Sequence, residues 1–307
     1  MAEIPIVLCF DDRILIGAGV TIKSLLDAAH DDTVYEINIF NPGFDADLKS
    51  VLASLVDNTR HSMRFFEIPP ERFKDVPKGR GSWTEIVYYR LLASEVLADR
   101  DRAIYSDVDV FFKQDLTEAF ETDLSDVEWA GVPVETNTPE KIMHYYFPEN
   151  TKPNIVTSCF MVMNLELMRE RNVIQRYFDT VETIGDRLKF FDLDLVNIAT
   201  PKIGEVSLKY SVFEELYETE DVRLAQDYAY LKTLYSDDDL ESVRNEPAVI
   251  HFAGRRGKPW QRLHTPAYYR EVESALPRGF RRFNFRNFRK KWLSRKGRRR
   301  YPTRSAS

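Results

Sequence analysis

Two aspartates, Asp107 and Asp109, are separated by one residue and come just after the apolar residues Ile104 and Tyr105. A further apolar run begins at Val110, so the two acids interrupt a segment that otherwise has the composition of a buried strand. Because a buried carboxylate is costly without a partner, we expect both side chains to share a cation. Carboxylate oxygens are typical ligands of Mn²⁺ and Mg²⁺. A solvated acidic loop is the alternative interpretation.

A second polar cluster begins at His251, inside the apolar segment 248–252. Gly254, Gly257 and Lys258 follow within seven residues. A neutral imidazole can complete the coordination of Mn²⁺, while a lysine supplies a compact positive charge for phosphate. A cation held by such residues can bridge the phosphates of a nucleoside diphosphate. A basic surface turn is the alternative.

The elements that must position these residues alternate between strand and helix patterns over the first 110 residues. Strand patterns cover residues 4–10, 34–40, 63–68 and 102–106, and helical patterns cover residues 20–29, 45–56 and 84–97. Asp45 is placed to cap the second helix, and Ser82 or Thr84 the third. This alternation predicts an α/β fold with a mainly parallel central sheet flanked by helices. Ligands of such sheets bind at the carboxyl ends of the strands, where Asp11-Asp12 and Asp107–Asp109 fall.

The second half of the chain is less regular. Strand patterns cover residues 129–134, 155–165 and 248–252, and helical patterns cover residues 166–183 and 194–199. The two cysteines, Cys9 and Cys159, both lie in apolar runs, and we expect them to be reduced core residues.

Charge is distributed unevenly along the chain. From Arg278 to the end there are 13 Lys or Arg residues and no Asp or Glu, which leaves 30 basic and 49 acidic residues, or −19, for the body. We therefore predict an acidic domain over residues 1–265 and a basic aromatic tail over residues 266–307.

Within the predicted tail, residues 277–301 interleave basic residues with Phe280, Phe283, Phe285, Phe288 and Trp292. Such a segment is typical of binding to an anionic membrane surface. Phosphate contacts with nucleic acid and a solvated arm are the alternatives. Because the body has a formal net charge of −19, it would repel a polyanion, and we expect no nucleic-acid partner.

Apolar runs in this chain are short. None reaches the roughly 18 residues that a membrane-spanning helix requires, and no basic region precedes the first apolar run. We expect a cytoplasmic protein that lies peripherally on the inner face of the cytoplasmic membrane.

Several segments, in order, resemble glycosyltransferase family 8, which includes bacterial lipopolysaccharide glucosyl- and galactosyltransferases and glycogenin. They are the first strand with Asp11-Asp12, residues 83–92 with Arg90, residues 105–109, residues 158–165, Asp192-Leu193-Asp194 with Asn197, Leu208-Lys209-Tyr210, and the run from His251 to Trp260. The resemblance covers residues 4–260. It implies a GT-A-type nucleotide-binding fold and a retaining, Mn²⁺-dependent enzyme (Mg²⁺ being possible). Such an enzyme moves glucose or galactose from a UDP-sugar donor to a cell-envelope glycan or lipid-linked acceptor.

The resemblance also implies roles for individual residues. The implied metal ligands are Asp107, Asp109 and His251, the implied donor-binding residues are Asp11, Asp12, Arg90, Asp107, Gly254 and Lys258, and the implied catalytic residues are Asp192 and Asp194. Among these, Lys258 and Gly254 would meet the diphosphate and Asp192 the sugar hydroxyls. Arg90 as a surface charge, and the aspartates as helix starts, are the simpler alternatives.

The family works with retention, which elsewhere often uses a carboxylate nucleophile. Family 8 lacks an obvious one, and the usual proposal is that the leaving phosphate helps to deprotonate the acceptor. The protein then contributes chiefly positioning and electrostatic stabilisation.

The chain departs from the family pattern at four points. Arg13-Ile14 stands where an aromatic often stacks on uracil, Thr157-Ser158-Cys159 replaces Asn-Ala-Gly, Leu193 replaces a Gln, and the spacing from His251 to Lys258 is one residue longer. These departures leave the base and the donor sugar open. A non-catalytic nucleotide-sugar or glycan-binding protein on the same fold is the alternative function. We expect acceptor contacts in the variable region 134–153.

Overall fold

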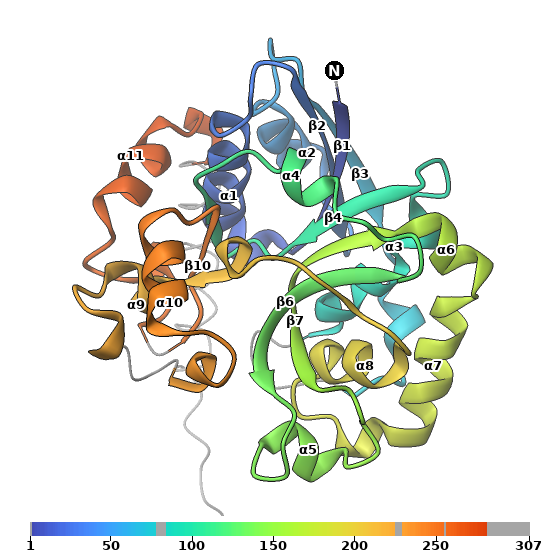
Figure 1. Ribbon diagram of the computed structural model, residues 1–307. Coiled ribbons are helices and arrows are strands. Elements are labelled where there is room, and N and C mark those ends of the chain that lie inside the picture. The colour runs from blue at the N-terminus through green and yellow to red at the C-terminus, as the bar shows by residue number, and fades with distance from the viewer. Residues whose placement is uncertain (1, 78–83, 225–228, 255, 281–307) are drawn as a thin grey trace, which may run out of the picture.

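The computed structural model describes residues 2–77, 84–224, 229–254 and 256–280. Its centre is a seven-stranded sheet of order β3-β2-β1-β4-β7-β6-β8 (Figure 1). The strands are β1 (Ala2–Cys9), β2 (Thr33–Asn41), β3 (Ser62–Glu67), β4 (Arg102–Ser106), β6 (Trp129–Thr136), β7 (Asn154–Asn164) and β8 (Gly204–Glu205). Neighbours pair in parallel except β4–β7 and β6–β7. The predicted α/β class with a mainly parallel sheet is confirmed.

A second, three-stranded sheet has the order β5-β10-β9. It is formed by β5 (Val110–Phe112), β9 (Val212–Phe213) and β10 (Val249–His251). β10 runs antiparallel to β5, and His251 is paired with Val110. This pairing brings the second polar cluster of the sequence beside the segment that joins β4 to β5.

Helices cover both faces of the large sheet (Figure 1). One face packs against α1 (Leu15–Asp27) and α2 (Ala46–Ala53), and the other against the 3₁₀ helix η3 (Glu85–Leu92), α3 (Ala93–Val96), α6 (Leu165–Glu170), α7 (Val173–Ile184) and α8 (Asp192–Ala199). Along β1, Ile6 and Leu8 belong to the first core and Val7 and Cys9 to the second. β1 is therefore buried on both faces, as expected for a central parallel strand.

The other helices of the described chain complete the fold. They are α4 (Thr117–Phe120), α5 (Ile142–Tyr146), α9 (Glu214–Glu218), α10 (Asp237–Asn245) and α11 (Ala267–Ala275), with 3₁₀ turns at Asp12–Ile14, Pro70–Phe73, Gly185–Arg187, Leu208–Ser211, Val222–Leu224, Ala229–Thr233 and Pro259–Gln261. The predicted cap is confirmed, because the Asp45 carboxylate accepts the Leu48 N–H at 2.8 Å. Ser82 lies outside the described residues.

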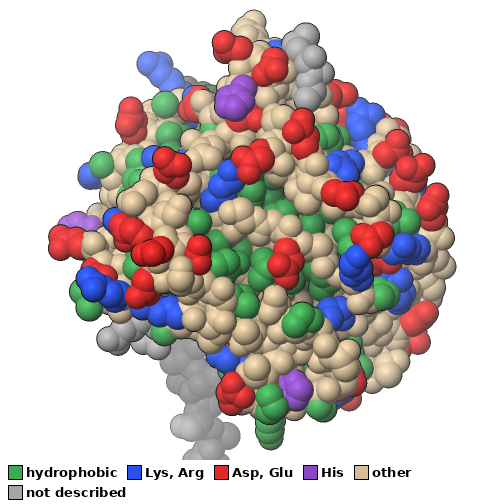
Figure 2. All heavy atoms as spheres, viewed as in Figure 1, with side chains coloured by type: hydrophobic (Ala, Val, Ile, Leu, Met, Phe, Trp, Pro, Cys, Tyr) green, Lys and Arg blue, Asp and Glu red, His purple; other side chains and the backbone are tan. Residues whose placement is uncertain are grey.

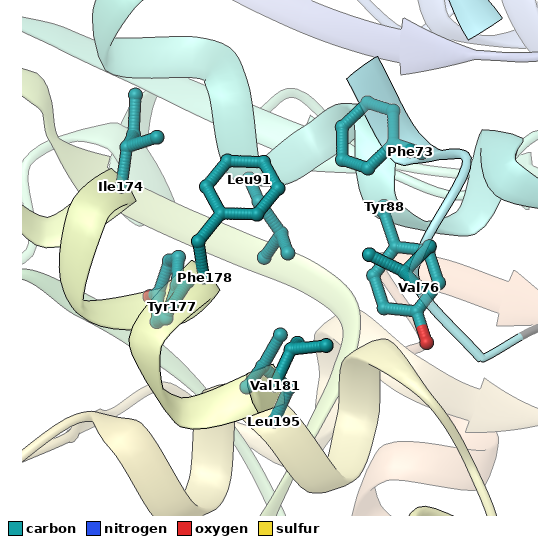
Figure 3. Close-up of a pocket in the computed structure, with 9 residues that line it drawn as sticks. All are labelled: Phe73, Val76, Tyr88, Leu91, Ile174, Tyr177, Phe178, Val181 and Leu195. Atoms are coloured by element: carbon teal, nitrogen blue, oxygen red, sulfur yellow. The ribbon is translucent and has the colours of Figure 1, made fainter. Parts of the chain in front are cut away.

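A small apolar gap lies in the second core, between η3 and α7 (Figure 3). It is lined by Phe73, Val76, Tyr88, Leu91, Ile174, Tyr177, Phe178, Val181 and Leu195. Its volume is about 10 Å³, room for about one water molecule. It is a packing gap beneath the helix that carries Arg90, and it is too small and too apolar to hold a nucleotide or a sugar.

The C-terminal part of the described chain packs against α1. A Cβ atom at Gly19 would lie 2.5 Å from the ring of Phe280, which is fully buried. Phe280, the first of the five aromatics named for the segment 277–301, is therefore a core residue and does not face a membrane. The other four aromatics lie outside the described residues, and the division at residue 265 stays a prediction. Within the described ranges, no helix is both long enough and apolar enough to cross a membrane.

Two helix predictions are wrong in part. Residues 166–183 form two helices, α6 and α7, because Asn172 takes a left-handed conformation (φ 50°) between them. Residues 84–97 begin as the 3₁₀ helix η3 and become α-helical only at Ala93. The prediction for the cysteines is confirmed, since Cys9 and Cys159 are both free and buried.

Candidate active site

Asp107, Asp109 and His251 come together where the two sheets meet. The two aspartates lie in the connection from β4 to β5, and His251 ends β10. The Phe252 N–H donates to the Asp109 carbonyl at 2.9 Å, which holds the two segments in register. His251 Nε2 lies 3.5 Å from Asp109 Oδ1 and 3.9 Å from Asp107 Oδ2.

This triad has the chemistry of a site for a divalent cation. One ligand atom from each residue lies within 4.8 Å of the others, His251 is buried and both aspartates are half-buried. Two carboxylate oxygens and one imidazole nitrogen suit a cation such as Mn²⁺. The structure thus brings together the three residues that the sequence singled out as metal ligands.

Asp107 is held from three sides. Its N–H donates to the Cys159 carbonyl at 2.9 Å. Its Oδ1 accepts the Tyr105 hydroxyl at 2.6 Å and Arg90 Nη2 at 3.0 Å. One carboxylate oxygen is therefore fixed by protein donors, and Oδ2 is the oxygen that faces His251.

Arg90 is buried, so its interpretation as a surface charge is wrong. Its guanidinium lies 4.0 Å from the ring centroid of Tyr105 and donates to the Ser158 carbonyl at 2.7 Å. Nη1 also lies 3.3 Å from Asp192 Oδ2. Arg90 thus joins Asp107, beside the metal triad, to Asp192 in α8.

Asp192 and Asp194 have different surroundings. Asp192 is 3% exposed and accepts the Ser158 hydroxyl at 2.8 Å. Burial raises the pKa of Asp192 to about 6, against the opposing effect of Arg90. Asp194 Oδ2 instead accepts two backbone N–H groups, those of Lys189 at 2.5 Å and Phe190 at 2.7 Å. The structure brings Asp192 to Arg90, whereas Asp194 is bound to its own loop.

Phe191, which precedes Asp192, has an unusual backbone conformation, with φ 51° and ψ −106°. L-residues rarely adopt positive φ, and holding a bulky one there costs roughly 1–3 kcal/mol. The strained residue is therefore the one that directs the chain into the start of α8.

Lys258 lies beside Asp109. Its ammonium contacts Asp109 Oδ2 and donates to the Phe252 carbonyl at 2.8 Å. Burial disfavours a charged Asp109, but His251 and Lys258 hold its pKa well below the usual value. Burial likewise opposes a charged His251, yet Cys159 and Asp109 hold its pKa well above the usual value. The triad without a cation is thus a cluster of opposed charges.

The loop after β10 requires its glycines. Gly254 and Gly257 have φ values of 93° and 74°, in the region that favours glycine. At the end of the loop, the Trp260 ring packs so closely on α1 that a Cβ atom at Gly17 would lie 2.5 Å from it. Trp260 therefore anchors the loop that carries Lys258 to the helix that follows Asp11-Asp12.

The first acidic pair lies at the carboxyl end of β1, as predicted. Asp11 accepts the Arg13 N–H at 2.9 Å and caps the 3₁₀ turn that Asp12 begins. The simpler interpretation of Asp11 as a cap thus describes its contacts here, while Asp12 is exposed. Binding of a donor by either residue stays a prediction.

Sequence reasoning missed three residues that hold the site: Tyr105, Ser158 and Cys159. The spacing of Tyr105 from Asp107 was a usable signal, because residues two apart on a strand point to the same face. For Ser158 and Cys159 the signal was their place at the segment that departs from the family pattern. The Cys159 thiol lies 3.1 Å from the Ser211 hydroxyl, next to the β9 strand.

A mainly parallel sheet, with an Asp-Asp-His triad that could hold a metal ion beyond the end of a central strand and a small second sheet beside it, is a GT-A-type nucleotide-binding fold. The model of glycosyl transferase family 8 matches residues 5–264, and the chain belongs to that family.

Solved structures share the fold at low sequence identity. The galactosyltransferase LgtC, in complex with donor and acceptor sugar analogues, is 22% identical, with a TM-score of 0.74 over 91% of this chain and 100% of that chain. GlyE of Streptococcus pneumoniae TIGR4 is 15% identical, with a TM-score of 0.61 over 100% of this chain and 66% of that chain. Mouse xyloside xylosyltransferase 1 is 13% identical, with a TM-score of 0.58 over 82% of this chain and 98% of that chain.

A curated relative is the glycosyltransferase GlyA of Streptococcus pneumoniae serotype 4. It is 24% identical over 188 residues, which are 61% of this chain and 23% of GlyA. The chain thus matches less than a quarter of the length of this relative.

Proposed function

We propose that this protein is a retaining hexosyltransferase that uses Mn²⁺, or Mg²⁺ in its place, to transfer glucose or galactose from a UDP-sugar to a cell-envelope glycan or lipid-linked acceptor. The observation that carries the proposal is the convergence of Asp107, Asp109 and His251 beside Lys258. Family membership and a fold shared with a galactosyltransferase support it.

Each residue of the site has a role in this proposal. Asp107, Asp109 and His251 would hold the cation, which when bound supplies positive charge to the leaving diphosphate. Lys258 lies against Asp109 and is half-exposed, so its ammonium is placed to turn toward a phosphate oxygen. The backbone at Gly254 is exposed and has no side chain to obstruct that phosphate.

Asp192 is proposed to accept hydrogen bonds from hydroxyls of the donor sugar. Arg90 contacts both Asp192 and Asp107, so it sets the position of the sugar-binding carboxylate relative to the metal site. The acceptor hydroxyl would lose its proton to an oxygen of the departing diphosphate on the same face of the sugar, which gives retention. The protein then accelerates transfer chiefly by positioning and electrostatic stabilisation.

A panel of nucleotide sugars tests the proposed function. The protein is incubated without acceptor with UDP-glucose, UDP-galactose and non-uridine donors, each with Mn²⁺, with Mg²⁺ and with a chelator, and nucleoside diphosphate release is measured. Metal-dependent release from one UDP-hexose is the expected result. If no donor is hydrolysed, calorimetry with Mn²⁺ shows whether a donor binds. Binding without hydrolysis would mean that turnover requires the acceptor. Neither hydrolysis nor metal-dependent binding would favour a non-catalytic glycan-binding protein.

The acceptor is proposed to bind over the variable region 134–153. In that region α5 exposes two large apolar side chains, Ile142 at 59% and Tyr145 at 75%. A saccharide ring presents apolar C–H faces that pack on such side chains. The face drawn in Figure 2 carries acidic and basic side chains around a centre where many hydrophobic side chains are visible.

The basic tail is proposed to hold the enzyme on an anionic membrane, at the inner face of the cytoplasmic membrane. Its charge is separated in sequence from the acidic body. We expect the full chain to sediment with phosphatidylglycerol vesicles and not with phosphatidylcholine vesicles. A chain truncated after Phe280 keeps the buried aromatic and is expected to stay in the supernatant. Equal sedimentation of the two chains would contradict the proposal.

A further inference from the structure

The loop before α8 combines a strained residue with a buried acid that is bound to the same loop. Among the described residues, three that are not glycine have positive φ: Asn58, Asn172 and Phe191. Asparagine tolerates such conformations because its side chain can bond locally. The Phe191 side chain is apolar and packs against the second core, so it cannot bond locally in this way, and its ψ of −106° lies outside the left-handed helical region as well. Something in the fold must hold it there.

The Asp194 side chain binds the two residues that precede Phe191. It is 1% exposed, and its Oδ2 accepts the N–H groups of Lys189 and Phe190, the two residues that precede Phe191. On the helical side, the Leu195 N–H donates to the Phe191 carbonyl at 3.0 Å. Hydrogen bonds therefore hold the chain on both sides of Phe191. The residues before it are bound by the Asp194 side chain, and its carbonyl accepts a bond within the first turn of α8.

The strained turn leads directly into Asp192. Asp192 comes directly after Phe191, and its Oδ2 lies 2.8 Å from the Ser158 hydroxyl and 3.3 Å from Arg90 Nη1. A relaxed Phe191 would change the direction in which the chain enters α8. Such a change would displace the Asp192 carboxylate from Ser158 and Arg90.

We propose that Asp194 is a positioning residue, which holds Phe191 in its strained conformation and thereby fixes the Asp192 carboxylate against Ser158 and Arg90. This role replaces the prediction that Asp194 acts on the substrate directly. The proposal rests on the proposed function where it assigns Asp192 to the donor sugar. The geometric part, the link from Asp194 to the position of Asp192, is independent of any activity.

Two substitutions of Asp194, one by Asn and one by Ala, distinguish a positioning role of this residue from a direct role in catalysis. Asp194→Asn keeps an oxygen that accepts the two N–H groups, and we expect it to retain at least about a third of the wild-type kcat. Asp194→Ala removes the acceptor, and a displaced Asp192 is expected to lower kcat by about 10²-fold. A residue that needed its charge for catalysis would be as impaired in Asp194→Asn as in Asp194→Ala, and that result would overturn the proposal.

Substitutions at residue 191 provide a matched pair. Phe191→Gly and Phe191→Ala lose the same ring from the second core, but only glycine is free of the penalty at positive φ. Each is combined with Asp194→Ala. We expect the glycine double variant to recover kcat at least about fivefold relative to the alanine double variant, because the turn no longer needs to be held. Equal kcat values in the two would contradict the proposal.

Crystal structures test the positioning role without any measurement of activity, and so also apply if the protein uses a different donor or shows no turnover. Crystal structures of wild type and Asp194→Asn are expected to keep Asp192 within hydrogen-bond distance of Ser158, and that of Asp194→Ala to show the contact broken. If Asp194→Ala does not fold, single Phe191→Gly and Phe191→Ala variants replace it, and glycine is expected to give the higher Tm. An unchanged Asp192 in Asp194→Ala, or a higher Tm with alanine, would overturn the positioning role.

Discussion

An Asp109→Asn variant is expected to release nucleoside diphosphate from its donor at least about 10³-fold more slowly than the wild type in the presence of Mn²⁺. Asp109 faces His251 Nε2 and Lys258, and its charged form is strongly favoured there. A neutral amide binds a cation less tightly and leaves Lys258 without its partner. Losing several kcal/mol of charge stabilisation corresponds to about three powers of ten in rate.

Calorimetry with Mn²⁺ measures the binding part of this effect, and UDP release measures the rate. Asp126→Asn is the matched control, because it makes the same chemical change at a surface ion pair with Lys202, where Asp126 is 64% exposed. The control is expected to bind Mn²⁺ and turn over as the wild type does. Metal-dependent turnover by Asp109→Asn at more than a tenth of the wild-type rate would remove Asp109 from the metal site.

The parallel half of the fold was predictable from sequence because its strands are long and buried on both faces. β1, β2 and β4 carry apolar runs that end at turns, and helical patterns separate them. In the small sheet, β10 was predicted, but β5 and β9 carry no recognisable strand pattern. β9 has two residues and β5 has three, which is too few for any periodicity to appear. They become strands because β10 pairs with both, and those partners are far away in sequence.

The break between α6 and α7 illustrates a different limit. Apolar residues continue at helical spacing through residues 166–183, so the pattern predicts one helix. The structure ends α6 at Glu170 and starts α7 at Val173, with Asn172 left-handed between them. Asparagine permits that conformation but does not require it. Both helices contribute buried residues to the second core, a tertiary arrangement that a local pattern does not report.

In the site, residues that follow strands were easier to place than those that contact one another across the fold. Asp107, Asp109 and His251 all lie at or after strand ends, and the sheet brings them together. The ion pair of Lys258 with Asp109 and the hydrogen bond of Ser158 with Asp192 link residues 149 and 34 positions apart. The different roles of Asp192 and Asp194 were also hidden, because the two residues differ in their partners and not in type.

The second large effect is expected at Asp192. Replacing it with Asn removes the charged acceptor for the sugar hydroxyls, and kcat/KM should fall about 10- to 100-fold, the value of one charge-assisted hydrogen bond. In the wild type, burial raises the pKa of Asp192 to about 6. Because the ionised form is the acceptor, kcat/KM at saturating Mn²⁺ should fall about tenfold per pH unit below 6. Saturating metal keeps His251 deprotonated, so this acid limb belongs to Asp192 and should be absent in the variant.

The stability of the Asp192→Asn variant should change in the opposite direction to its activity: the variant should be more stable than the wild type at high pH. A carboxyl whose pKa is higher in the folded than in the unfolded protein stabilises the fold below the unfolded pKa, near 3.8, and this contribution is lost as the pH rises through about 6. A difference of about two units between the folded and unfolded pKa of Asp192 lowers the free energy of unfolding by roughly 3 kcal/mol at pH 8. Asp192→Asn has no such charge to bury, and its Tm at pH 8 should exceed that of the wild type by several degrees. Near pH 4 the two proteins should be nearly equal.

Scanning calorimetry at pH 4 and pH 8, together with a pH profile of kcat/KM for both proteins, measures the two effects on the same samples. An Asp192→Asn variant that is less stable at pH 8 and keeps the acid limb would assign that limb to another group and make Asp192 a purely structural partner of Arg90. A variant that is more stable and less active would show that the fold retains a destabilising buried carboxylate. Selection keeps such a group where its ionised form is needed for function.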